Sequence, residues 1–219
     1  MTTPVHVDIW SDIACPWCYI GKRRFEAGVA AFDGDVTVTY HSFELAPDTP
    51  VDFEGSAADF LSQHKGMPRE QVEQMLQQVT AIARGVGLDY DLDAVHQTTT
   101  LLAHQSLHHA REQGRQLELV ERLFEAYFVE GRHVGKVDEL VALGADAGLD
   151  AGELRAALED DRYVGAVAAD LDQARAYGIR GVPFYVIGGR YGVSGAQRPE
   201  VFTQALTQVR QEQSQVRSS

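Results

Sequence analysis

The chain has 219 residues, of which 44% are hydrophobic and 9% aromatic, and it carries a formal net charge of −13. This apolar content is typical of a folded globular protein, and the length allows one large domain or a domain with a sizeable insertion. The negative charge argues against a nucleic acid partner and against binding to an anionic membrane surface.

The first residues show neither a positively charged start nor an apolar run of signal-peptide length, and no stretch predicts a membrane span. We therefore expect a cytoplasmic protein. Thiols are kept reduced in that compartment, and structural disulfides are rare there. Cys15 and Cys18 are the only cysteines, so a disulfide between them would be catalytic or redox-sensing rather than structural.

The first 43 residues predict a β-α-β unit. Residues 5–10 alternate apolar and polar side chains, as a half-buried strand does. After the cysteine pair, Phe25, Val29 and Phe32 recur at helical spacing. Residues 36–43 are rich in β-branched and aromatic side chains and predict a second strand. Such a unit favours a right-handed crossover and parallel pairing of its two strands.

From residue 57 to about residue 177 the pattern is helical throughout, with breaks at glycines and prolines and one unclear stretch at residues 89–100. The helical signal stops at Gly178. Residues 184–187 then predict a strand, Gly188-Gly189 a hairpin turn, and residues 190–194 the returning strand.

A last amphipathic helix begins at Pro199, a residue that suits the first helical position. The two ends of the chain therefore predict an α/β fold with one four-stranded sheet and helices on both of its faces. We expect residues 1–55 and 178–219 to form one discontinuous domain. Residues 56–177 would be an all-helical insertion that covers one edge of the cysteine site.

The C-P-W-C sequence lies between the first strand and the first helix, where redox chemistry needs it. A helix N-terminus stabilises the thiolate, which is the reactive form, so we expect Cys15 to have a depressed pKa and to be the more exposed thiol. Pro16 suits a helix start, and Trp17 would offer a flat apolar contact to a substrate. Cys18, one turn further in, would resolve the mixed disulfide that Cys15 forms.

Two other interpretations of the pair are open. A structural zinc site needs four ligands; no second C-x-x-C exists, and His104 and His108 lie far along the chain within a helical pattern, so we predict no metal. The cysteines could also be inert core residues. Asp12 is a candidate proton acceptor for Cys18, or else a solvated loop acid or a helix N-cap.

Three spaced motifs together resemble a known family: C-P-W-C after a strand, G-V-P-F before a late strand, and S-G-A-Q-R-P-E before the final helix. The sequence is similar to the DsbA-like thioredoxin-fold oxidoreductases, and most similar to their FrnE-type cytoplasmic branch. The resemblance implies a thioredoxin fold with a helical insertion. It also implies that Pro183 is a cis-proline facing the cysteine pair, and that Val182 offers its backbone N–H and C=O to a substrate strand.

The chain departs from the thioredoxin-fold pattern at Ile9, where many members carry a buried acid. Proton transfer to and from Cys18 would then use Asp12, Asp8 or water. From the residues alone, Trp10, Phe43 and Phe184 are candidates for the core or for the walls of the site, and Phe184 is also a candidate for substrate binding.

These features predict a thiol-disulfide oxidoreductase that reduces, forms or isomerises disulfides and needs no cofactor beyond the redox-active Cys15–Cys18 pair. Its partners would be proteins or small molecules that carry thiols or disulfides, together with a reducing or oxidising partner. The chain would act as a monomer or homodimer. Two alternatives stay open: a glutathione-dependent isomerase or transferase of small molecules with the same fold, and a redox-regulated chaperone or binding module.

Overall fold

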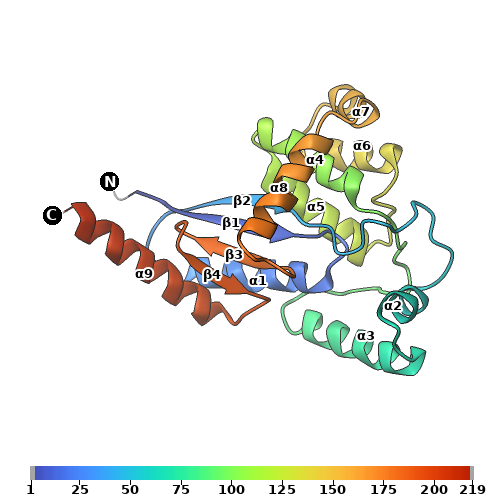
Figure 1. Cartoon of the computed structure of the whole chain (residues 1–219), viewed down its shortest axis with the longest axis horizontal. Helices are drawn as coiled ribbons and strands as arrows, with labels where there is room; N and C mark the ends of the chain where they lie inside the picture. The colour runs from blue at the N-terminus through green and yellow to red at the C-terminus, as the bar shows by residue number, and fades with distance from the viewer. Residues whose placement is uncertain (1–2, 218–219) are drawn as a thin grey trace.

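The computed structural model describes residues 3–217 and contains a four-stranded mixed sheet at its centre (Figure 1). The strands are β1 (Val5–Ser11), β2 (Val36–Ser42), β3 (Phe184–Ile187) and β4 (Tyr191–Ser194), arranged in the order β2-β1-β3-β4. β1 and β2 are parallel, whereas β3 is antiparallel to both of its neighbours. The predicted β-α-β and β-β-α order and the parallel first pair are confirmed.

Helices cover both faces of this sheet, as the alternation along β1 requires. Val5, Val7 and Ile9 point into the main apolar core, which α1 (Pro16–Ala30) and α9 (Pro199–Arg217) complete. Trp10 points to the opposite face and packs with Ala174 at the end of α8 (Val164–Ala176). In Figure 1, α8 accordingly crosses the sheet on the side away from α1 and α9.

The other helices lie between β2 and α8 in the chain. They are α2 (Ala57–Lys65), α3 (Arg69–Arg84), α4 (Leu101–Glu112), α5 (Gln116–Phe128), α6 (Val137–Asp146) and α7 (Ala151–Glu159). In Figure 1, α2 and α3 form a pair set apart from the group α4–α7. A capping box starts α2, with Ser56 and Asp59 each accepting the other's backbone N–H, and Gly66 ends it in the left-handed conformation.

Residues 89–100, the stretch that the sequence pattern left unclear, are not helical. This stretch is irregular apart from one turn near residues 91–94. Its three aspartates and three consecutive threonines explain the absence of a helix, because such side chains compete for backbone hydrogen bonds or lose rotamer freedom in a helix. The stretch instead lies across the start of α1, where the Tyr90 hydroxyl donates to the Pro16 carbonyl oxygen over 2.7 Å.

A half-buried ionic cluster joins α1 to α5. The Glu121 carboxylate accepts hydrogen bonds from Lys22, Arg23 and the Tyr19 hydroxyl. Burial alone would raise the pKa of Glu121, but the hydrogen bonds from Arg23 and Lys22 outweigh it and lower that pKa to about 2. Beside this cluster, the ring of Tyr19 stacks on Phe124 of α5 with centroids 5.0 Å apart. These contacts fix α1 against the helical segment as well as against the sheet.

A second polar cluster ties α8 to β2 and α4 on the other face of the sheet. Asp170 accepts hydrogen bonds from the Ser42 backbone N–H over 2.8 Å and pairs with His41 over 2.8 Å and His108 over 3.2 Å. Burial opposes ionisation of Asp170, yet the hydrogen bonds from His108 and His41 hold its pKa well below the ordinary value. Burial likewise opposes the charged form of His41, but its hydrogen bonds with Asp170 and Asp8 raise its pKa.

This cluster should make the stability of the fold decrease both at low pH and at high pH. The contribution of Asp170 is present above the ordinary aspartate pKa of 3.8 and is lost as pH falls below it. The contribution of His41 is fully present below the ordinary histidine pKa of 6.5 and is lost as pH rises through its raised value. In the wild-type protein, the free energy of unfolding measured with urea should fall as pH rises above about 6.5, and in His41→Gln this fall should be absent. A matched change of an exposed histidine, His96→Gln, should keep that decline; equal slopes in both variants would contradict the assignment.

Glycine at position 21 allows α1 to approach β3. A Cβ there would lie 2.6 Å from the Tyr185 hydroxyl and 2.9 Å from Pro183 Cγ. We expect Gly21→Ala to lower the free energy of unfolding by about 1–3 kcal/mol, since overpacking outweighs the gain in helix propensity. Gly165→Ala in α8 is the control, because nothing lies within 4 Å of its Cβ; it should stabilise by up to about 1 kcal/mol. Urea denaturation measures both, and stabilisation by both would refute the packing argument.

Candidate active site

The N-terminus of α1 holds the cysteine pair. Cys15 is the N-cap residue, with extended backbone (φ −90°, ψ 111°), and Pro16 occupies the first turn. No side chain caps this end, so the first N–H groups of the helix and its positive dipole end lie beside the Cys15 side chain. The Cys18 N–H donates to the Cys15 carbonyl oxygen over 2.9 Å, which places the second thiol one turn further along.

Both thiols are buried. The exposed fractions are 3% for Cys15 and 2% for Cys18, so Cys15 is the more exposed thiol by a small margin only. The Val182 carbonyl, from outside the motif, lies against Cys15. Within the motif, Trp17 is the exposed side chain, with 38% of its surface accessible.

The loop before β3 faces Cys15. The Val182–Pro183 peptide bond is cis, as the resemblance implied. Cys15 Sγ lies 3.6 Å from the Val182 carbonyl oxygen and donates to it. Pro183 is buried against Gly21 of α1, and its carbonyl oxygen accepts the Gly195 N–H over 2.8 Å. Val182 therefore lies against Cys15, and the role of Val182 and Pro183 at the site stays a prediction.

Cys18 is held in its protonated form. Burial raises its pKa well above the ordinary thiol value, and the neighbouring Cys15 sulfur raises it further. Interactions with the Ser11 side chain and the Asp12 backbone oppose this shift without cancelling it. A protonated inner thiol beside an outer one at a helix N-terminus is the division of roles that a nucleophile and a resolving cysteine need.

Asp12 is buried, with 1% of its surface exposed, so the solvated-acid interpretation is wrong. Its carboxylate accepts the Ala14 N–H over 3.2 Å and the Leu45 N–H over 2.8 Å. Neither N–H belongs to α1, so Asp12 is not the N-cap either; it holds the cysteine loop to the β2–α2 connection. The buried ring of His104 approaches it, with Nε2 3.5 Å from Asp12 Oδ1.

Four of the predicted residues point away from the pair. Asp8 pairs with His41 and His6 on the α8 face of the sheet, which leaves Asp12 or water for proton transfer. Phe184 packs with Trp10 on that same face, where the partly buried Phe43 also lies. Pro183 and Phe184 are adjacent residues, so the strand turns their side chains to opposite faces.

His104 and His108, the two histidines considered as zinc ligands, lie in different environments. His108 bonds to Ser42 Oγ over 3.1 Å and belongs to the Asp170 cluster, whereas His104 approaches Asp12. Within residues 3–217, no group of three or more histidine, cysteine, aspartate or glutamate side chains is arranged to hold a metal ion.

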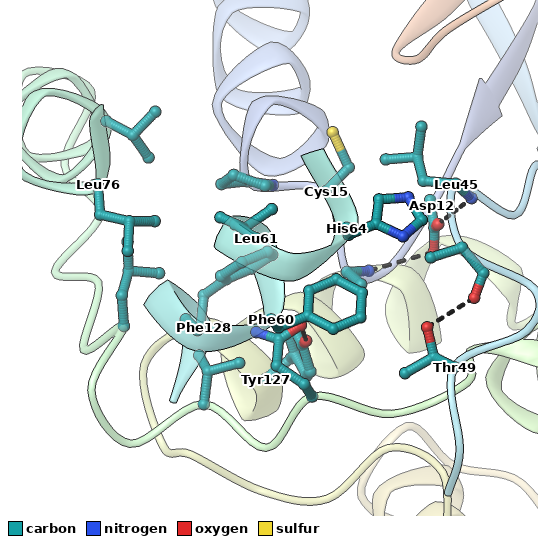
Figure 2. A pocket seen from close by; sticks show the side chains of 18 of the residues that line it. Asp12, Cys15, Leu45, Thr49, Phe60, Leu61, His64, Leu76, Tyr127 and Phe128 are labelled. Carbon is teal, nitrogen blue, oxygen red and sulfur yellow. Dashed lines mark hydrogen bonds between the residues drawn. The ribbon is translucent and has the colours of Figure 1, made fainter. Parts of the chain in front are cut away.

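A cavity of about 500 Å³ lies beside Cys15 and was not predicted in this form (Figure 2). Its walls come from the start of α1, the β2–α2 connection, α2, α3, residues 92–100 and the end of α5. The only sequence signal for it was the expectation that the helical insertion covers one edge of the site. Which side chains would face Cys15 could not be read from periodicity, because it depends on how the α2–α3 pair docks.

Residues 6–207 match the model of the DSBA-like thioredoxin domain. The chain belongs to this family. Membership agrees with the cysteine pair at the start of α1, the cis-proline opposite it and the helices inserted between β2 and β3. The narrower FrnE-type branch stays a prediction.

Relatives cover nearly the whole of this DSBA-like chain. The protein YwbO of Bacillus subtilis is 30% identical over 204 residues, which are 93% of this chain and 96% of that protein. A probable DsbA oxidoreductase from Streptomyces coelicolor is 44% identical, with a TM-score of 0.88 over 95% of this chain and 91% of its own. A 2-hydroxychromene-2-carboxylate isomerase shares the fold at 15% identity and a TM-score of 0.74, over 96% of this chain and 98% of its own.

In residues 3–217, none of the helices of this DSBA-like chain combines the length and apolar character that crossing a bilayer requires.

The raised pKa of Cys18 predicts unequal reactivity of the two thiols. In the folded Cys18→Ser variant, iodoacetamide should alkylate Cys15 at least about tenfold faster near neutral pH than it alkylates Cys18 in Cys15→Ser. Burial, the larger cause of the Cys18 shift, remains when Cys15 is replaced. Mass spectrometry gives the rates, and in urea the two variants should react alike. Faster alkylation of Cys18 in the folded protein would reverse the assigned roles.

Proposed function

We propose that this DSBA-like protein is a thiol-disulfide oxidoreductase whose redox-active group is the Cys15–Cys18 pair. The observation that carries the proposal is the position of Cys15 Sγ: at the N-terminus of α1, 3.6 Å from the Val182 carbonyl oxygen, with Cys18 one turn behind it. The identity of 44% to a probable DsbA oxidoreductase supports the same class of reaction.

In the reductive direction, the Cys15 thiolate attacks one sulfur of a substrate disulfide. A Cys15–substrate disulfide forms, and the other substrate sulfur leaves as a thiolate that takes a proton. Cys18 then loses its proton and attacks Cys15 Sγ, which releases the second substrate thiol and leaves the Cys15–Cys18 disulfide. The same steps in reverse oxidise a substrate dithiol, so the direction of electron flow depends on the potential of the pair and of its partner.

Substrate binding would use the two surfaces that flank Cys15. Val182 offers backbone hydrogen-bonding groups to an extended chain, and Trp17 offers an exposed ring. Pro16 fixes the backbone between the two cysteines, and the buried Pro183 keeps the Val182 carbonyl against the sulfur. Phe184 would support this loop from the far face of the sheet rather than contact the substrate.

Asp12 is the proposed proton acceptor for Cys18, acting through water. The carboxylate is buried close to the pair in the chain, and Asp8 faces the other side of the sheet. Beyond the cysteine pair, the reaction needs no cofactor. We further propose a cytoplasmic protein, monomeric or homodimeric. It would act on thiol- or disulfide-bearing proteins or small molecules and exchange electrons with a separate redox partner. Residues 56–177 would be its inserted helical subdomain.

Insulin reduction by a dithiol reductant tests the proposal. The wild-type protein should accelerate precipitation of the insulin B chain, and Cys15→Ser should return the rate to background because no mixed disulfide can form. Cys18→Ser should instead accumulate a mixed disulfide, seen as a mass increase that a reductant reverses. Full activity of Cys15→Ser would disprove the mechanism. Activity that requires glutathione and survives Cys18→Ser would favour the isomerase alternative.

A further inference from the structure

The cavity beside Cys15 has the size of a small-molecule site. Its volume is about 500 Å³, and pockets that hold small organic ligands range over about 300–1,000 Å³. Figure 2 shows Cys15 at the start of α1 among the residues that line the cavity, with Leu76 of α3 and Phe128 of α5 also labelled. The residue that carries the reactive sulfur therefore forms part of the cavity wall.

The walls of the cavity are mainly apolar. Phe60 and Leu61 from α2, Leu76 from α3 and Phe128 from α5 line it, together with Val95 of the irregular stretch. Burial of an aromatic or aliphatic body against such side chains is favourable in proportion to the apolar surface removed from water.

Two basic side chains stand at one edge of the cavity. His64 and Lys65, in the last turn of α2, both line it. The acid in the wall, Asp12, is less available to a ligand, because backbone N–H groups of Ala14 and Leu45 already occupy its two oxygens. Thr98, also in the wall, has a buried hydroxyl without a partner among residues 3–217. These groups suit a carboxylate or another hydrogen-bonding anion on an otherwise apolar molecule.

We infer that the cavity binds a small organic disulfide with an apolar, aromatic body and a carboxylate, and presents its sulfur to Cys15. The inference rests on the proposed function and names a substrate class for the same pair. A polypeptide would meet Cys15 along Val182, where backbone groups are exposed to it. The cavity lies toward α2 and α3 and is enclosed by six segments of the chain, so it admits only a compact molecule.

The reaction balances without a further group. Cys15 attacks the substrate disulfide, one aromatic thiolate leaves and takes a proton, and the other half of the substrate stays bonded to Cys15 in the cavity. Cys18 gives up its proton and displaces that half as a second thiol. Two electrons pass from the cysteine pair to the substrate disulfide, and a low-molecular-weight thiol returns the pair to its reduced form.

Single-turnover kinetics of the reduced protein with 2,2′-dithiodibenzoate test the inference, with hydroxyethyl disulfide as a small polar comparison. The rate with dithiodibenzoate should saturate, and its apparent Kd should be at least about tenfold below any seen with hydroxyethyl disulfide, since only the former buries an apolar body. The sulfur-free carboxylate 2-naphthoate should compete with dithiodibenzoate in the wild-type protein, which makes the test independent of how any variant folds.

Two leucine substitutions provide the matched pair. Leu61→Trp fills the cavity, and the ratio of the rate constants for dithiodibenzoate and hydroxyethyl disulfide should fall about tenfold. Leu117→Trp makes the same change at a leucine of α5 that is 45% exposed and outside the cavity, and the ratio should stay unchanged. His64→Gln combined with Lys65→Gln should weaken dithiodibenzoate binding about threefold, as expected for a half-exposed charge interaction.

The outcomes separate the inference from the proposed function. If wild-type protein reduces insulin through Cys15 but shows no saturation with dithiodibenzoate and no competition by naphthoate, the inference is overturned and the proposed function stands. An unchanged rate ratio in a folded Leu61→Trp protein also overturns the inference. If Cys15 reacts with none of these disulfides, including insulin, both fail. Saturation, competition and the loss in Leu61→Trp together support the inference.

Discussion

The packing of α1 between the sheet and the helical segment determines where the Cys15 sulfur lies. On one side, the absence of a side chain at Gly21 lets the helix approach Pro183 and Tyr185. On the other, the half-buried Glu121 accepts hydrogen bonds from Lys22 and Arg23, one turn beyond Cys18. The helix N-terminus that stabilises the thiolate is therefore itself held in place by contacts from both parts of the chain.

Sequence alone could predict what depends on local pattern. The strands follow from alternation at Val5, Val7 and Ile9 and from the glycines at 188 and 189, which both adopt positive φ in the hairpin. The cysteine pair at a strand-to-helix junction follows from C-P-W-C and the periodicity after it. The cis bond before Pro183 needed the resemblance, since nothing in the residues G-V-P-F by themselves distinguishes it from an ordinary trans proline.

What sequence could not predict depends on contacts between distant segments. Asp12 was open to three interpretations because its burial is set by the β2–α2 connection and by His104, which lie about thirty and ninety positions away in the chain. Asp170 and Glu121 are likewise paired with side chains from other elements, which local periodicity does not reveal. The burial of Cys15 has the same origin, since Val182 covers it from the far end of the sequence.

The overall charge and the charge of Lys65 at the cavity edge have opposite signs, and distance decides which of the two a ligand experiences. A net charge of −13 repels an anion from afar. At physiological ionic strength, however, interactions between exposed charges are largely screened beyond about 8 Å. An anion that reaches the edge of the cavity is within that distance of His64 and Lys65, but it is further from the acids on the remote helices. The long-range field would therefore slow the encounter, and the local pair with the apolar walls would govern the affinity. The association rate of a carboxylate-bearing aromatic disulfide should therefore depend on salt concentration more than that of its neutral counterpart. The two molecules should also differ in affinity, because only the carboxylate interacts with His64 and Lys65.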